Sequence, residues 1–358
     1  MASTRRIRIV CISDTHNQTP KLPPGDILIH AGDFSNQGTF SELQKTVKWL
    51  RQAQFRVKIL VCGNHDVTCD IPFYEQHGGR FHNKKIEDPQ RCIDLFRTEP
   101  TFVYLNHEAK LVRLDFDDNT YTVLKVFGSP YSPARGFWAF GYAPEKATEL
   151  WNQVPLDSDL IIAHTPAKGH RDRCSARGTA GCKVLQQVLG RVRPKLFVCG
   201  HIHEGHGVEI VTWDTSSLGR GCGESDIRQY EDQAPDSKKL FTVDLSSRSR
   251  GSALQNDGSI DHITCLVGQT VQEVTPVDGE ETIALDASGS NRTASVMDLI
   301  SDFEKKETRS GRLQTCVVNA AYMGKNWPHK DGKTFHKPIV IDLDVPILTN
   351  ATIEETSG

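Results

Sequence analysis

The chain has 358 residues, of which 37% are hydrophobic, and a net charge of −3. This length suits one large α/β domain with an insertion as well as it suits two domains, and the apolar content is sufficient for a real core. The charge provides no basic footprint for nucleic acid, and no apolar run is long enough to cross a membrane. We therefore expect a soluble protein that acts on neither a membrane nor a polynucleotide.

The ten cysteines form no C-x-x-C pair and show no zinc-ribbon spacing. The apolar run near the N-terminus is also too short for the core of a secretory signal. These features predict a cytoplasmic protein with reduced thiols rather than a disulfide framework.

Short apolar runs alternate with helical patterns over the first two hundred residues. Phe40, Leu43, Val47 and Leu50 recur at helical spacing, and a second stripe at 184–189 has Gly190 as its expected C-cap. This alternation predicts an α/β sheet covered on both faces. The strand candidates, in chain order, are residues 7–13, 26–32, 56–63, 121–129, 159–164, 195–201, 313–321 and 337–345.

The composition changes near Thr212, and from there to about Arg312 it is rich in Ser, Gly, Asp and Gln. We predict an insertion at 212–312, partly disordered or loop-rich, in a domain formed by residues 1–211 and 313–358. Within it, 240–246 and 262–268 could be strands, and 296–303 forms an amphipathic stripe. The insertion could also bind a protein partner, which the sequence does not identify.

Five strand candidates end in side chains that commonly bind metals. In an open α/β sheet, functional groups collect outside the carboxyl ends of the strands, so these residues are expected to share one site. In chain order they are Asp14 and His16, then Asp33, then Asn64, His65 and Asp66, then His164, and finally His201 and His203.

The spacing of these residues has a mechanical interpretation. Asp14 and His16 are two apart, so on extended backbone both side chains would point the same way, and the same holds for His201 and His203. A glycine beside a ligand allows a tight bend or a close approach to an ion, and three such glycines are Gly32, Gly63 and Gly200.

The residue types predict two divalent metal ions. Carboxylate, imidazole and amide ligands suit Mn, Fe or Zn, and the absence of cysteine argues against a soft thiolate site. Seven ligands exceed the needs of one ion, whereas two ions sharing a carboxylate would use them all. Asp33 is the natural bridge because it stands alone on its strand. The predicted ligands are Asp14, His16, Asp33, Asn64, His164, His201 and His203.

Such a pair of ions can hydrolyse a phosphoester bond. His65 is then left over, and we expect it to donate a proton to the leaving oxygen, with Asp66 orienting its ring. His170 and Arg171 could contact a substrate phosphate, or could belong to a solvated basic loop. Tyr131 and Trp138 could stack a base, or could pack a loop.

The motifs D-x-H, G-D, G-N-H-D, H and G-H-x-H occur in this order, and the set resembles that of the calcineurin-like metallophosphoesterases. The resemblance implies an α/β fold arranged as a four-layer α/β/β/α sandwich. It also implies that one ion is held by Asp14, His16, Asp33 and His203, and the other by Asp33, Asn64, His164 and His201.

Segments 127–140, 163–172 and 192–207 look like the branch of small metallophosphoesterase-domain proteins described in animals. This branch implies phosphodiesterase activity, including on cyclic nucleotides, with Mn among the preferred ions. Some of its members carry Gly where this chain keeps His201. By contrast, "GDFSNQG" lacks the Asp and Arg of Ser/Thr protein phosphatases, and Asn36 replaces the tyrosine of purple acid phosphatases.

The sequence thus predicts a metal-dependent phosphohydrolase, most simply a phosphodiesterase acting on small nucleotides. Two alternatives stay open: a phosphomonoesterase of a small metabolite, and a nucleotide- or metal-binding regulator with little turnover. The complete ligand set together with His65 favours an enzyme.

Overall fold

The computed structural model describes residues 3–176, 178–215, 223–233, 237, 240–249, 253–258, 311–324 and 332–349. The expected strand at 262–268 and the stripe at 296–303 lie outside the described residues.

One sheet has six strands, and its middle carries the beginning of the chain. The neighbours from β1 to β4 run parallel, whereas β17 is antiparallel to β1 and parallel to the edge strand β15. In spatial order the strands are β15 (Phe241–Asp244), β17 (Ile339–Pro346), β1 (Thr4–Ile12), β2 (Ile27–Ala31), β3 (Val57–Val61) and β4 (Phe102–Tyr104).

The second sheet has eight strands, with four parallel strands in its centre, β6, β9, β12 and β16. Their bounds are β6 (Thr120–Ser129), β9 (Leu160–Ala163), β12 (Leu196–Cys199) and β16 (Gln314–Asn319). Antiparallel strands complete it: β13 (Gly207–Asp214) and β14 (Gly223–Tyr230) on one side, and β18 (Leu348–Thr349) and β5 (Glu108–Asp115) beside β6. Two small ribbons pair β7 (Ser132–Pro133) with β8 (Gly141–Tyr142), and β10 (Arg173–Cys174) with β11 (Gly178–Thr179).

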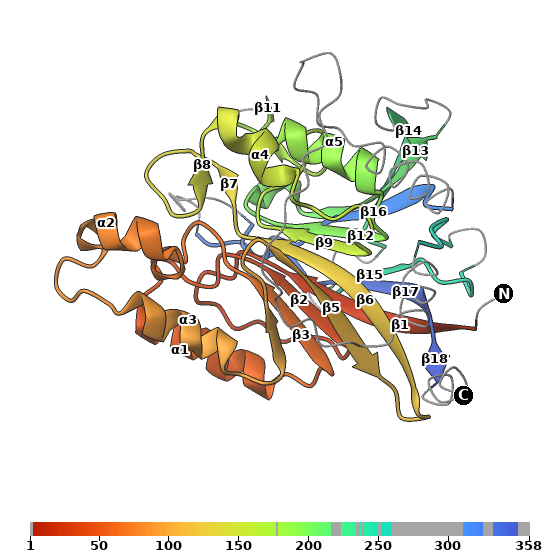
Figure 1. Ribbon diagram of the computed structural model, residues 1–358, viewed down its shortest axis with the longest axis horizontal. Helices are drawn as coiled ribbons and strands as arrows, with labels where there is room; N and C mark the ends of the chain where they lie inside the picture. The colour runs from red at the N-terminus through yellow and green to blue at the C-terminus, as the bar shows by residue number, and fades with distance from the viewer. Residues whose placement is uncertain are drawn as a thin grey trace, which may run out of the picture.

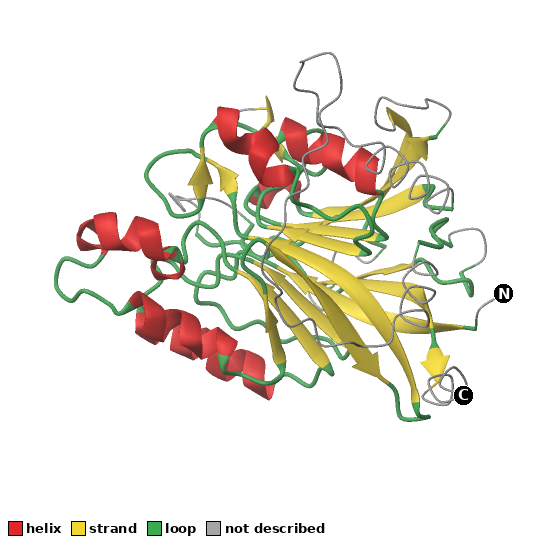
Figure 2. Ribbon diagram, viewed as in Figure 1, coloured by secondary structure: helices red, strands yellow, loops and turns green. Residues whose placement is uncertain are grey.

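The helices cover the outer faces of the two sheets (Figures 1 and 2). The helices α1 (Phe40–Gln52) and α3 (Pro89–Arg97) pack on the first sheet, and α4 (Ala147–Trp151) and α5 (Lys183–Val192) pack on the second. The helix α2 (Ile71–Phe81) packs against α3 beyond the end of the first sheet. Three short 3₁₀ turns are η1 (Val67–Cys69), η2 (Pro144–Lys146) and η3 (His203–Gly205). A large buried apolar cluster joins the inner faces of the two sheets. The predicted four-layer α/β/β/α sandwich is therefore confirmed.

Helix α1 begins with a capping box at Thr39. The Thr39 side chain accepts the backbone N–H of Glu42, and the Glu42 carboxylate accepts the backbone N–H of Thr39, which together form a capping box. The predicted stripe of Leu43, Val47 and Leu50 is buried against the sheet.

The expected end of α5 at Gly190 is wrong. Gly190 is buried inside the helix, which continues to Val192 because that apolar side chain extends the buried face. The helix ends at Arg193, whose φ of 52° is left-handed.

The described parts of the range 212–312 belong largely to the two sheets. Strand β13 continues to Asp214, β14 pairs with β13, and β15 lies at the edge of the first sheet. The expected strand at 240–246 is thus found as β15. For the rest of the range, the insertion stays a prediction.

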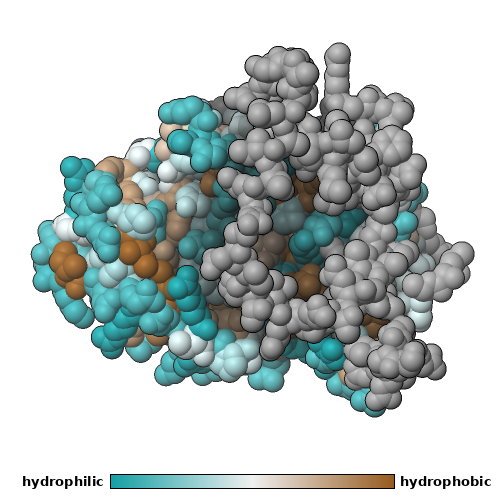
Figure 3. All heavy atoms as spheres, in the orientation of Figure 1, coloured by the Kyte–Doolittle hydropathy of each residue, from teal (hydrophilic) through white to brown (hydrophobic). Residues whose placement is uncertain are grey.

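The described surface in Figure 3 is mostly hydrophilic, and hydrophobic side chains gather at the end of the molecule where α2 lies. Ile86, after α2, is 61% exposed, and Phe137, which packs on α2, is 40% exposed. Within the part of the chain that the structure describes, no helix combines the length and the apolar character needed to span a bilayer.

Candidate metal centre

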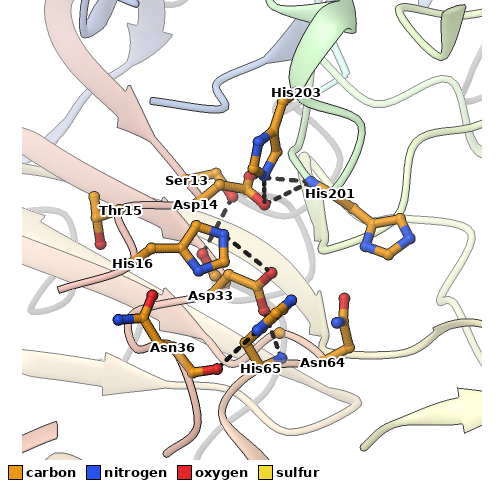
Figure 4. A network of polar contacts seen from close by, with 12 residues as sticks. Ser13, Asp14, Thr15, His16, Asp33, Asn36, Asn64, His65, His201 and His203 are labelled. Carbon is orange, nitrogen blue, oxygen red and sulfur yellow. Dashed lines mark hydrogen bonds and ion pairs between the residues drawn. The ribbon is translucent and has the colours of Figure 1, made fainter. Parts of the chain in front are cut away.

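The carboxyl ends of strands from both sheets meet at one edge of the sandwich. Asp14, Asp33 and Asn64 follow β1, β2 and β3, while His164 and His201 follow β9 and β12. Backbone hydrogen bonds link the residues that follow neighbouring strands. Asp14 N–H donates to Gly32 O, after β1 and β2, and Gly200 N–H donates to His164 O, after β12 and β9. Figure 4 shows Asp14, His16, Asp33 and His203 close together at this edge, with Asn64 and His65 beside Asp33.

Asp14, His16 and His203 form one group whose ligand atoms all lie within 4.8 Å of one another. His203 Nε2 lies 3.3 Å from Asp14 Oδ1, and His16 Nε2 lies 3.7 Å from Asp33 Oδ2. All four side chains are buried. The Asp33 carboxylate therefore lies next to this group, although Asp33 is not one of its members.

Asp14, Asp33 and His164 form the second group. His164 Nε2 lies 3.4 Å from Asp33 Oδ2 and 3.1 Å from Asn64 Oδ1. His201 joins this region through its backbone N–H, which donates to the Asp14 carboxylate at 3.0 Å, and through its ring, whose centre lies 5.0 Å from that of His164. The structure thus gathers all seven predicted ligands at one edge.

The backbone at these residues is not extended, contrary to the expectation from their spacing. Asp14, His16, Asp33 and His201 have φ values of 51°, 43°, 55° and 65°. These left-handed conformations cost free energy in non-glycine residues and persist only where the surroundings hold them. The side chains converge because the chain turns sharply at each strand end, not because alternate residues share a strand face.

The expected close approach at the glycines is present. Gly32 has a φ of +104°, and a Cβ atom there would collide with the His164 ring. At Gly200 a Cβ atom would collide with Ser13 and with the Asp14 carboxylate. Any larger residue at either position would push a candidate ligand out of place.

The donor atoms fit divalent cations. The Nδ1 of His164 lies 2.9 Å from Ala31 O and that of His16 lies 3.1 Å from Ser35 O, so each ring donates through Nδ1 and directs Nε2 at the carboxylates. The Nε2 of His164 then faces two oxygen acceptors, Asp33 Oδ2 and Asn64 Oδ1. Such a cluster of electron-pair donors requires a shared cation, which is either a proton or a metal ion.

The pKa values agree with this interpretation. Burial lowers the pKa of His16 to about 4 and that of His201 to about 3, so both rings are neutral and able to bind a metal at pH 7. Burial also opposes charge on His164, but the neighbouring Asp33 carboxylate outweighs it and raises the His164 pKa to about 9. For Asp33, burial raises the pKa, yet the surrounding histidines outweigh it and hold the pKa well below its usual range. Without a metal, His164 thus holds the proton that a metal ion would displace.

His65 lies at the cavity beside this centre and is held on several sides. Its Nδ1 lies 2.8 Å from the Asn36 carbonyl oxygen, its backbone N–H donates to Asp33 Oδ1 at 2.8 Å, and its ring centre lies 4.0 Å from that of Trp138. Since Nδ1 donates to a carbonyl, Nε2 is the nitrogen left for a substrate.

Asp66 does not orient the His65 ring, so the predicted contact is wrong. Its carboxylate accepts the backbone N–H groups of Phe34, Ser35 and Gly63, at 3.2, 3.0 and 2.9 Å, and the Ser35 hydroxyl at 2.7 Å. Burial and the charge of Asp33 raise the pKa of Asp66 to about 7. Asp66 therefore ties together the loops that follow β2 and β3, and the ring is oriented by a backbone carbonyl that no motif could reveal.

His170 and Arg171 are not available to a substrate phosphate, so their predicted contact is also wrong. The His170 side chain is completely buried, with Nδ1 2.7 Å from Glu209 and Nε2 3.2 Å from Glu224. The Arg171 guanidinium donates to Val208 O and lies 3.5 Å from Glu209. These residues instead contact the carboxylates of Glu209 on β13 and Glu224 on β14, which are distant in sequence.

A cavity of about 800 Å³ opens over the candidate metal centre. The expected residues that line it are His16, Asp33, Asn64, His65, His201 and His203. Arg135 and Lys333 also line the cavity, and no sequence motif identified them. Trp138 lines it too, where the sequence left open whether it stacks a base or packs a loop. One sequence feature could have identified Arg135 and Trp138: they lie in a loop containing Pro and Gly that follows the carboxyl end of β6, where functional groups collect.

Comparisons with known proteins agree with this geometry. Residues 7–205 match the family model described as calcineurin-like phosphoesterase. A probable rhamnogalacturonate lyase C of Emericella nidulans is 41% identical over 210 residues, which is 58% of this chain and 18% of that protein. Metallophosphoesterase domain-containing protein 1 of Homo sapiens is 35% identical over 56% of this chain and 62% of its own length, and a UPF0046 protein of Caenorhabditis elegans is 34% identical over 57% and 66%.

The family match covers more than half of the chain and includes every candidate ligand. The chain therefore belongs to the calcineurin-like phosphoesterases, the family of metal-dependent hydrolases of phosphoester bonds. The matched regions span 18%, 62% and 66% of the lengths of these three relatives.

Proposed function

We propose that this chain hydrolyses a phosphoester bond in a small molecule, with a phosphodiester, including that of a cyclic nucleotide, as the leading substrate class. The observation that carries the proposal is the convergence of seven metal-ligand side chains at one sheet edge, beside a histidine whose Nε2 is left for a substrate. A small substrate suits a cavity of about 800 Å³.

Two divalent ions fit the donor set. Asp14, His16, Asp33 and His203 would hold one, and Asp33, Asn64, His164 and His201 would hold the other. These donor types suit Mn, Fe or Zn, and we take Mn as the first ion to test. Bound ions would supply Lewis-acid chemistry, because they neutralise phosphate charge and make water a better nucleophile at neutral pH.

The chain's own residues then handle the leaving group. His65 donates a proton from Nε2 to the leaving oxygen, because its Nδ1 is already committed to Asn36 O. Trp138 packs against the His65 ring, and Asp33 accepts the His65 backbone N–H, so the ring is fixed relative to the metal ligands.

The test compares hydrolysis of bis(p-nitrophenyl) phosphate with hydrolysis of p-nitrophenyl phosphate, using metal-stripped protein to which Mn is added back. We expect diester cleavage only with metal. For His65→Ala we expect kcat to fall by about a hundredfold or more on cyclic AMP, whose alkoxide leaving group needs a proton, and to fall less on bis(p-nitrophenyl) phosphate. Metal content measured in parallel should stay at two ions per chain in that variant.

Other results would change the proposal in defined ways. A preference for the monoester would retain the metal centre and identify a phosphomonoesterase. Two bound ions without turnover of either ester would point to a binding protein. Binding of fewer than two ions would contradict the proposed centre itself.

A further inference from the structure

Two cationic side chains line the catalytic cavity without belonging to the metal centre. Arg135 lies in the loop between β7 and β8, and Lys333 lies in the segment before β17. Both side chains are exposed, and neither forms an ion pair within the described ranges of the chain.

The loop that carries Arg135 is fixed on both sides of this residue. Ala134 N–H donates to Tyr142 O at 2.8 Å, and Phe140 N–H donates to Asp70 Oδ2 at 2.7 Å. Phe137 packs on α2, where its ring centre lies 5.4 Å from that of Phe73. Arg135 is therefore held at the cavity without the full entropic cost of ordering a mobile loop.

The carboxylates of the cavity do not neutralise these two cations. Asp33 faces the metal ligands. The Glu42 carboxylate is occupied by Asn17 Nδ2 at 2.7 Å, Thr39 N–H at 2.9 Å and Asn36 N–H at 3.3 Å. Among the described residues that line the cavity, Asp33 and Glu42 are the only acidic ones, and neither forms an ion pair with Arg135 or Lys333.

Lys333 also lines a second cavity, of about 1060 Å³, together with Pro23, Leu240, Tyr322 and Phe335. The two cavities therefore adjoin at this lysine. A substrate group that extends beyond the scissile phosphate would pass Lys333 and find further space there.

We propose that Arg135 and Lys333 bind a second anionic group of the substrate, separate from the phosphate that is cleaved. The substrate class is then a phosphoester that carries an additional carboxylate or phosphate on one of its ester groups. This inference rests on the proposed function, because the metal centre is taken to bind the scissile phosphate.

The test uses two matched diesters, p-nitrophenyl 4-carboxyphenyl phosphate and p-nitrophenyl phenyl phosphate, which share a leaving group and differ by one carboxylate. With Mn-loaded protein, we expect kcat/KM to favour the carboxylate ester by about threefold to thirtyfold, the range for two partly exposed ion pairs. The difference should lie mainly in KM and should shrink as salt is added.

The double variant Arg135→Gln, Lys333→Gln should hydrolyse the two diesters with the same kcat/KM. Arg135→Lys should keep part of the preference because it keeps the charge. Lys48→Gln, at an exposed position on α1 away from the cavity, serves as the control and should change nothing.

Binding of 4-carboxyphenyl phosphate and phenyl phosphate to the metal-loaded protein, measured by calorimetry, gives a second comparison that needs no turnover. If neither diester is hydrolysed but 4-carboxyphenyl phosphate binds more tightly than phenyl phosphate, the proposed function is overturned and the anion site is supported. Equal values for the two compounds in the wild type, in both measurements, would overturn the anion site. A preference that survives in the double variant would overturn it as well.

Discussion

At the scale of single residues, the position of His65 depends on its neighbours more than on its motif. Asn36 O fixes one ring nitrogen, Asp33 fixes the backbone, and Trp138 covers a ring face. Glu42 accepts the Asn36 N–H at 3.3 Å, so the cap of α1 also supports the loop that orients His65. A general acid needs this kind of support because small displacements of a reacting group lower the rate strongly.

Trp138→Ala should therefore lower kcat by about tenfold or more while leaving metal binding unchanged. The loss should be larger for cyclic AMP, whose alkoxide leaving group needs a proton, than for bis(p-nitrophenyl) phosphate, whose leaving group is stable as an anion. Steady-state kinetics on both substrates measure this ratio. Trp138→Phe, which keeps an aromatic ring, should recover most of the activity. Equal losses on the two substrates would argue against an effect through His65.

The ligand types of the centre could be predicted from the sequence because each follows a buried strand and has a chemical preference of its own. The side-chain contacts of His65, Asp66 and His170 could not be predicted from the sequence. A backbone carbonyl such as Asn36 O has no signature in the sequence, and Glu209 and Glu224 are far from His170 along the chain. Local motifs thus predict which residues gather, whereas long-range folding determines which atoms meet.

At the scale of elements, the loop after β9 is tied to β13 and β14 by one buried imidazole. His170 lies between Glu209 of β13 and Glu224 of β14, and Arg171 faces Glu209 as well. Burial opposes charge on His170, but the two carboxylates outweigh it and raise its pKa above the ordinary value. The charged form of His170 is therefore favoured in the folded protein.

This arrangement predicts a pH-dependent contribution to stability. Because the folded pKa of His170 is raised, its contribution is complete below the unfolded value of about 6.5 and is lost as pH rises through the folded value. The difference in free energy of unfolding between wild type and His170→Gln should therefore be larger at about pH 6 than at about pH 9. Urea denaturation at both pH values measures it. A difference that is constant or grows with pH would show that the charge of His170 does not stabilise the fold.

The central strands could be predicted from their buried apolar runs, and α1 from an apolar stripe at helical spacing. Strand β14 could not, because all but its last residue are exposed and its side chains show no apolar alternation. It is a strand because β13 offers it a hydrogen-bonding edge, with pairs from Val208–Tyr230 to Asp214–Gly223. Edge strands of this kind depend on the sheet beside them rather than on their own residues.

At the scale of the whole molecule, the two sides of segment 259–310 are fastened at one place. Asn256 and Arg312 pair as an antiparallel bridge, and Asp257 N–H donates to Gly311 O at 3.3 Å. Arg312, which is 1% exposed, donates to Gly258 O and to Ser158 O, both at 2.6 Å. The residues on either side of the segment are therefore anchored to the core independently of what lies between them.

Replacement of residues 259–310 by a short glycine–serine linker should consequently leave the sandwich folded and the metal centre complete. The joined ends are already adjacent, so closing a shorter loop costs little conformational entropy. We expect two bound metal ions, an unchanged thermal unfolding midpoint within a few degrees, and a kcat on bis(p-nitrophenyl) phosphate within about twofold of the full chain. Metal analysis, circular dichroism and steady-state kinetics provide these measurements. As a control, Arg312→Ala in the full chain should lower the unfolding midpoint, because it leaves buried carbonyl groups without their donor. A folded, metal-loaded deletion variant with strongly reduced turnover would instead show that the segment contributes to catalysis.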